Sequence, residues 1–147
     1  MKIKNFNEHS TKVISAFPGC GKSHYFKNCS DKIVLDSDSS TFDKSDFPRN
    51  YIEHIKSNLG KADVIMVSSH KEVRDALVKN EIEFTLVYPE SSIKEEYIQR
   101  YIDRGSPESF VNLLTNNWEN WIGELSEQIG CEKITLNKGQ YLSDVLN

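Results

Sequence analysis

The sequence has few cysteines and no long hydrophobic run. Its 147 residues include three cysteines, without the CxxC or Cys/His spacing of a metal site. A reduced intracellular compartment is therefore expected. No apolar segment is long enough to cross a membrane, and the polar stretch 1–11 lacks the apolar segment of a secretion signal. We expect a cytoplasmic protein without a membrane partner.

A large charge of one sign is also missing, as are internal repeats and low-complexity tracts. The net charge is −4, from 18 basic and 22 acidic residues. This balance does not favour nucleic acid as a partner, although a local basic groove would still permit it. The length is sufficient for one domain, spanning 1–147, with a core of its own. The oligomeric state stays open.

A glycine-rich stretch follows the first apolar run and precedes an expected helix. It reads Ala16-Phe17-Pro18-Gly19-Cys20-Gly21-Lys22-Ser23, followed by His24. This is the pattern of a phosphate-binding loop, with Ala16 in place of the first glycine. Such a turn directs backbone N–H groups into one concavity that suits an anion. Residues 18–24 are the predicted nucleotide-binding residues; the alternative is a glycine turn beside a surface lysine.

Three side chains of this loop have specific expected properties. Lys22 is predicted to reach the terminal phosphates, and the Ser23 hydroxyl to ligate Mg²⁺. The start of the following helix is expected to lower the pKa of the Cys20 thiol. Oxidation of Cys20 is expected rather than catalysis, because the loop acts through its backbone, Lys22 and Ser23.

Apolar runs alternate with helical patterns along the whole chain. The expected strands are 12–17, 32–35, 62–67, 84–88 and 133–136. The expected helices are 22–28, 48–59, 69–78, 92–102, 106–129 and 141–146. Ser69 with Glu72, and Ser92 with Glu95, match the capping-box pattern. The alternation predicts an α/β fold, a three-layer sandwich around a five-stranded, mainly parallel sheet.

Polar clusters follow the expected strands, at the edge where parallel sheets bind ligands. Asp36 and Asp38 follow the second strand. We expect Asp36 to hold Mg²⁺ and Asp38 to accept the proton of an attacking hydroxyl or to anchor the substrate. The alternative is a turn in which these carboxylates bond their own backbone.

The third strand ends in Ser68-Ser69-His70, without a carboxylate. Many phosphate-loop NTPases coordinate metal from this position, so its absence argues against an ATPase motor. His70 is either a solvent-facing residue or a substrate contact, and Ser69 is expected to cap a helix.

Two arginines near the end of an expected helix are candidate catalytic residues. Arg100 and Arg104 are four residues apart and share one helix face. Guanidinium groups stabilise the charge that phosphoryl transfer develops. The alternative for Arg100 and Arg104 is a solvated face paired with Glu96 or Asp103. Weaker candidates for holding an acceptor phosphate are Arg49 and Arg74, whereas Trp118 and Trp121 are expected to pack in the core rather than stack on a base.

The phosphate loop, the Asp36-Ser37-Asp38 cluster and Arg100 with Arg104 together resemble the small phosphate-loop kinases of the nucleoside-monophosphate kinase superfamily. The likeness is to short proteins of the kind found in bacteriophage genomes. It implies a P-loop NTPase fold with a small helical lid, and ATP and Mg²⁺ as cofactors. By position, the lid would be 92–110 and the acceptor-binding segment 42–61. The segment 137–141, after the fifth strand, would pass the adenine ring.

The expected function is transfer of the γ-phosphoryl group of ATP to a small acceptor, a nucleotide or a nucleoside. A kinase acting on nucleic-acid ends or modified bases is one alternative. A nucleotide-binding regulatory module or weak NTPase without an acceptor is another, because the third strand lacks a carboxylate. The sequence does not identify the acceptor.

Overall fold

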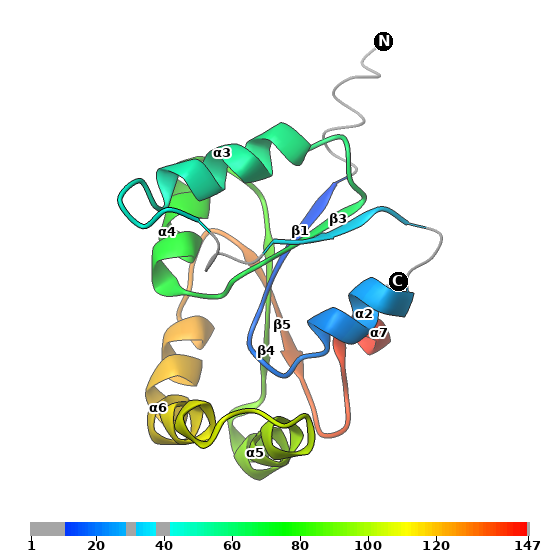
Figure 1. Cartoon of the computed structure of the whole chain (residues 1–147), viewed down its shortest axis with the longest axis vertical. Helices are drawn as coiled ribbons and strands as arrows, with labels where there is room; N and C mark the ends of the chain where they lie inside the picture. Colours follow the sequence, from blue (N-terminus) through cyan, green and yellow to red (C-terminus); the bar gives the residue numbers. More distant parts are fainter. Residues whose placement is uncertain (1–10, 29–31, 38–41, 147) are drawn as a thin grey trace.

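The structure, a computed structural model, describes residues 11–28, 32–37 and 42–146. Its strands are β1 (Lys12–Ala16), β2 (Val34–Asp36), β3 (Val64–Val67), β4 (Thr85–Pro89) and β5 (Glu132–Leu136). All pairings are parallel, and the strand order is β2-β3-β1-β4-β5 (Figure 1). The prediction of an α/β fold with a five-stranded parallel sheet is confirmed.

Helices flank this sheet. They are α2 (Lys22–Asn28), α3 (Arg49–Asn58), α4 (Lys71–Lys79), the 3₁₀ helix η2 (Ser91–Ile93), α5 (Lys94–Asp103), α6 (Glu108–Ser126) and α7 (Leu142–Val145). Figure 1 shows α3, α4 and α6 to one side of the strands, and α2 and α7 to the other. This arrangement fits three layers. Within the part of the chain that is described, no helix combines the length and the apolar character needed to cross a bilayer.

The central strands are the most deeply buried part of the molecule. All four residues of β3 are buried, and β1 is buried from Val13 onward. Both strands have neighbours on each side and helices over each face, which favours continuous apolar runs. Because β1 is the middle strand, the chain leaves it at the centre of the sheet's carboxyl edge.

The expected capping boxes are wrong. Helix α4 begins at Lys71 with His70 at its N-cap position, and no side-chain bond caps it. The carbonyl of Ser69 instead accepts a hydrogen bond of 2.8 Å from Arg74 Nε. Ser92 lies within η2, where the Glu90 side chain accepts from the backbone N–H of Ser92 and so fills the capping role. At η2 another side chain therefore takes the capping role, whereas at α4 the bond from Arg74 goes to a carbonyl and no side chain caps the helix.

Candidate functional site

The glycine-rich loop connects β1 to α2 and needs glycine at two positions. Gly19 has a φ of +91° and Gly21 a φ of +96°, values that side-chain-bearing residues rarely adopt. A Cβ on Gly19 would lie 2.9 Å from Cε1 of Tyr101, and one on Gly21 would lie 3.0 Å from Cδ2 of Tyr141. Backbone conformation and close packing therefore both exclude larger residues.

The carbonyl groups of this loop are bonded inside the protein. The Tyr101 hydroxyl donates to the Pro18 carbonyl at 2.8 Å, and Arg100 Nη1 donates to the Gly19 carbonyl at 2.7 Å. The backbone N–H of Leu142 donates to the Cys20 carbonyl at 2.8 Å. Because these oxygens already have partners within the protein, the loop is held in a conformation that does not direct them at an anion on its open side.

Arg100 connects the loop to two further segments. Its Nη2 donates to Glu96 Oε2 at 2.6 Å and to the Gln140 carbonyl at 2.9 Å. Its guanidinium carbon lies 4.3 Å from the centre of the Tyr97 ring and 3.8 Å from that of Tyr141. Only 10% of the side chain is exposed, and the buried Nε has no partner among the described residues. Arg100 therefore holds the loop, α5 and the segment before α7 together, and we call it the clamp of the loop. Its expected catalytic role stays a prediction.

Cys20 is buried under the loop. Its thiol contacts the Tyr97 hydroxyl at 3.6 Å and the Val87 carbonyl at 4.0 Å. Burial raises the pKa of the Cys20 thiol to about 11, although Tyr97, Arg100 and Lys22 act in the opposite direction. The expectation of a lowered pKa is wrong, because loss of solvent outweighs the nearby positive groups.

A cleft of about 540 Å³ opens beside the loop. The residues that line it from the loop and α2 are Pro18, Gly19, Gly21, Lys22 and His24. Its opposite wall is formed by Arg100, Asp103, Arg104, Phe110 and Tyr141. The tertiary structure thus brings most of the predicted loop residues and both predicted arginines to one cleft, which is within the usual size of ligand sites, roughly 300–1,000 Å³.

Arg104 differs from Arg100 in being exposed to solvent. Its Nε donates to Ser106 Oγ at 3.1 Å. Its guanidinium carbon lies 5.2 Å from the centre of the Tyr101 ring and 5.6 Å from that of Phe110. Contacts of this length to aromatic faces leave most of its N–H donors available to a ligand in the cleft.

The predicted carboxylates are not at the cleft as described. Asp36 is exposed at the end of β2 and is not among the cleft residues. Since β3 separates β2 from β1, two strand spacings of about 4.8 Å put Asp36 about 10 Å across the sheet from the loop strand. Asp38 and the Ser23 side chain lie outside the described residues. Among those that are described, no three His, Cys, Asp or Glu residues are grouped to hold a metal.

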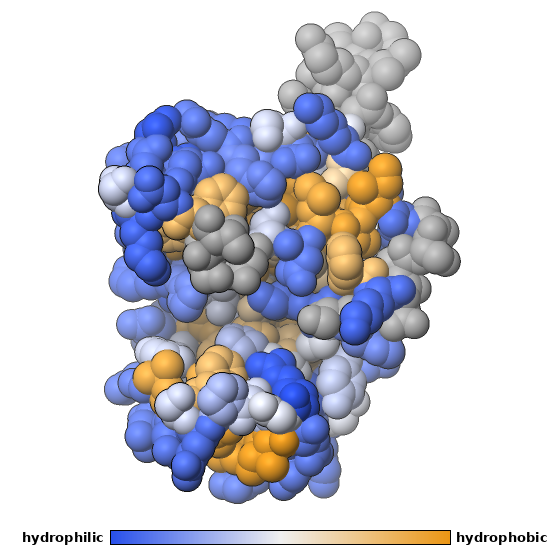
Figure 2. All heavy atoms as spheres, viewed as in Figure 1, coloured by the Kyte–Doolittle hydropathy of each residue, from blue (hydrophilic) through white to orange (hydrophobic). Residues whose placement is uncertain are grey.

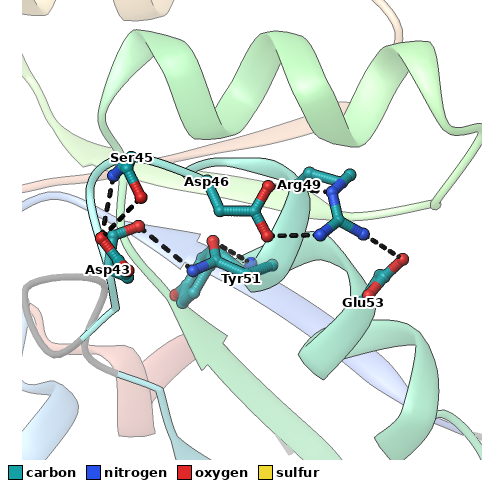
Figure 3. Close-up of polar contacts among 7 residues, drawn as sticks. Asp43, Ser45, Asp46, Arg49, Tyr51 and Glu53 are labelled. Atoms are coloured by element: carbon teal, nitrogen blue, oxygen red, sulfur yellow. Dashed lines mark hydrogen bonds and ion pairs between the residues drawn. The ribbon is translucent and has the colours of Figure 1, made fainter.

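The expected acceptor segment, 42–61, carries a cluster of ion pairs on its surface (Figure 3). Arg49 pairs with Asp46 through two of its nitrogens and with Glu53 at 2.8 Å. The Asp43 carboxylate accepts bonds from the backbone and hydroxyl of Ser45. Arg49 is 64% exposed. Its expected role in binding an acceptor phosphate stays a prediction. The carboxylates of Asp46 and Glu53 would compete with such a phosphate for the guanidinium.

A second cavity, of about 260 Å³, lies between α4 and α6. We call it the α6 cavity. Its apolar lining consists of Phe17, Phe110, Leu113, Leu114, Trp121 and Leu125, and its polar lining of Ser69, His70, Lys71, Arg74 and Glu124, with Pro18 at one end. Trp118 does not line it and packs in the core against Phe17, as the sequence predicts.

Arg74 is the residue whose position the sequence did not reveal. It is only 4% exposed, although its helix position suggested a surface residue. Its Nη1 donates to Gln128 Oε1 at 2.6 Å, and its Nη2 lies 3.6 Å from Glu124 Oε1. The contact with Gln128 spans 54 residues, so no local pattern signals it.

Comparison with known proteins finds no matching family model and no matching curated protein.

Proposed function

We propose that this protein is an ATP-dependent phosphotransferase of the P-loop NTPase fold, which transfers the γ-phosphoryl group of ATP to a nucleotide or nucleoside. The observation that carries the proposal is the cleft that joins Gly19, Gly21 and Lys22 to Arg104. The loop stands at the centre of the carboxyl edge, where parallel sheets bind their ligands. A phosphate-binding pattern and a facing guanidinium are two of the parts that phosphoryl transfer uses.

Some cleft residues would bind the phosphates of ATP, and others would stabilise the transition state. Lys22 and the backbone of the loop hold the phosphates, and Arg104 stabilises the charge that develops during transfer. Arg100 acts as a positioning residue, because it fixes the Gly19 carbonyl and the turn before Tyr141. Tyr141, 39% exposed in the cleft wall, offers an aromatic face to the base of the nucleotide.

The described residues are compatible with Mg²⁺ as a cofactor. Mg²⁺ is usually held by one or two carboxylates together with substrate phosphates and water, so it does not need a cage of protein ligands. Asp36 supplies an exposed carboxylate at the end of β2, two strands from the strand that carries the loop and level with Ile14. Ser23 would hold the ion directly and Asp36 only through bridging water; when bound, the ion would neutralise phosphate charge. Asp38 would orient the acceptor hydroxyl and accept its proton.

The proposal is tested by supplying labelled ATP with a panel of acceptors. The panel contains nucleosides, nucleoside monophosphates and the 5′ ends of DNA and RNA. We expect transfer to a nucleoside or a monophosphate. Lys22→Ala should reduce it about 100-fold or more, since a group aimed at the reacting phosphates is lost. Lys27→Ala, an exposed lysine on the same helix, is the matched control and should leave transfer unchanged.

Other outcomes would contradict the proposal in distinguishable ways. Full turnover in Lys22→Ala would show that the loop is not the ATP site. ATP binding without any acceptor would favour a regulatory module or weak NTPase, and transfer only to nucleic-acid ends would favour a kinase of that kind. Asp38→Asn should block transfer while ATP binding persists; equal loss of both would indicate a structural or metal-binding role for Asp38.

A further inference from the structure

We infer that the α6 cavity binds the base of the acceptor, and that the acceptor is therefore a nucleoside or nucleotide whose base lies between α4 and α6. This inference rests on the proposed phosphotransferase function and specifies where its second substrate binds. None of residues 42–61, the segment expected to bind the acceptor, lines this cavity.

The first support is that the two hollows share a wall. Pro18 and Phe110 line both the cleft beside the loop and the α6 cavity. Pro18 directly precedes Gly19 in the loop. A molecule whose ring occupies the cavity can therefore extend its polar end past Pro18 toward phosphates held by the loop. Transfer requires donor and acceptor to be adjacent in this way, in contact and oriented.

The second support is the shape and chemistry of the lining. Three aromatic residues, Phe17, Phe110 and Trp121, contribute to it. Aromatic side chains offer flat faces on which a planar ring stacks, whatever its identity. The volume, about 260 Å³, is just below the usual range for whole ligands, roughly 300–1,000 Å³, and suits one ring system rather than a larger ligand.

The third support is a polar pair at the cavity. Arg74 carries five N–H donors, of which the bonds to Ser69 and Gln128 use two. Its Nη2 lies 3.6 Å from the Glu124 carboxylate, too far for a direct hydrogen bond. The cavity thus presents spare donors from a buried cation beside a carboxylate acceptor. A base edge that combines an acceptor with an amino or ring N–H donor matches this pair.

The α6 cavity combines polar groups with lining residues that solvent reaches. Nε and one Nη1 donor of Arg74 bond within the protein, and its Nη2 is not among the buried atoms without a partner, so a base edge would replace water at these remaining donors. Trp121, Leu113 and Phe110 are all partly exposed or exposed, so the cavity is open to a ligand from the α6 side. These properties distinguish it from a packing gap in the core.

The inference is tested by calorimetric titration with the four ribonucleosides, thymidine and their 5′-monophosphates, without ATP. Leu113→Trp enlarges an exposed lining residue and should weaken binding about tenfold by obstructing the cavity. Asn112→Trp, also exposed on α6 but outside the lining, is the matched control and should change binding less than about twofold. ATP affinity, measured separately, should stay the same in both variants.

A second variant tests the polar pair without adding bulk to the cavity lining. Glu124 is about half exposed, and Glu124→Gln keeps its size while removing the charge. It should weaken binding of the preferred base. Because it also removes the carboxylate 3.6 Å from the buried Arg74, thermal stability is measured alongside, and binding is compared at a temperature at which both proteins are folded. The inference is overturned if ATP binds but no nucleoside or nucleotide of the panel does, or if Leu113→Trp and Asn112→Trp behave alike. Failure of the proposed function is a separate result, since Lys22→Ala would then leave ATP binding intact.

Discussion

Arg100 and Arg49 occupy similar local settings in two different regions of the molecule. Each forms an ion pair with a glutamate four residues away on its own helix, Glu96 in α5 and Glu53 in α3. The Arg100 side chain is 10% exposed, whereas that of Arg49 is 64% exposed. The two pairs are alike in sequence spacing and differ in what surrounds them.

Arg100 contacts distant segments of the chain, whereas Arg49 contacts its sequence neighbours. Arg100 lies between the rings of Tyr97 and Tyr141 and also bonds the Gly19 carbonyl. Figure 3 shows Arg49 reaching only the two acidic side chains beside it. Exposed pairs contribute about 0–1 kcal/mol, while removing one partner of a buried pair costs about 3–5 kcal/mol. The i,i+4 spacing of an ion pair therefore does not reveal whether that pair stabilises a site.

The largest expected effect follows removal of the buried guanidinium. Arg100→Leu should lower the free energy of unfolding by about 3 kcal/mol, because the Gly19 and Gln140 carbonyls and the Glu96 carboxylate each lose a donor. Urea denaturation measures the change. ATP affinity should also fall, since the loop loses its clamp.

Arg100→Lys separates the effect of the positive charge from that of the planar guanidinium. Lysine keeps the charge but lacks the planar fork and the stacking of the guanidinium. We expect it to be intermediate between wild type and Arg100→Leu. A change of less than about 0.5 kcal/mol in Arg100→Leu, the size typical of neutral surface substitutions, would show that the clamp does not stabilise the fold.

A smaller effect is expected from pH, through Cys20 in the same buried region. The folded-state pKa of its thiol is about 11, against an ordinary value of 9.0. The protonated thiol is therefore favoured by folding, and this stability is present below pH 9 and lost as pH rises toward 11. The loss should be about 2 kcal/mol by the linkage relation.

Denaturation at a series of pH values in wild type and Cys20→Ala measures this loss. Burial also raises the pKa values of Tyr97 and Tyr101, so both proteins should lose stability at the highest pH. Only wild type should show the additional fall between pH 9 and 11. Parallel curves would mean that the thiol ionises as easily in the folded protein as in the unfolded chain.

The smallest change in the free energy of unfolding is expected at the exposed Arg49. Arg49→Ala should change the free energy of unfolding by no more than about 0.5 kcal/mol, because its partners Asp46 and Glu53 remain hydrated. The same urea titration detects it. A loss near that of Arg100→Leu would remove the distinction between the two regions.

Much of the fold was predictable because its signals are local. The apolar run of β3, the glycine-rich loop after β1 and the alternation of strands and helices each lie within a short window of sequence. The capping boxes at Ser69 and Ser92 were wrong: His70, not Ser69, is the N-cap residue of α4, and Glu90 caps the 3₁₀ turn that precedes α5. The lowered pKa expected for Cys20 was wrong because burial is a property of the assembled structure.

Residue type and spacing were enough to predict a phosphate-loop pattern after a buried strand in an α/β chain. The surroundings of the loop depend on how distant segments pack. Arg100 bonds the Gly19 carbonyl across 81 residues, and Arg74 meets Gln128 across 54. The α6 cavity likewise arises where the β1 loop, α4 and α6 pack together. Contacts between distant segments form only when the sheet and its helices assemble, so no local pattern encodes them.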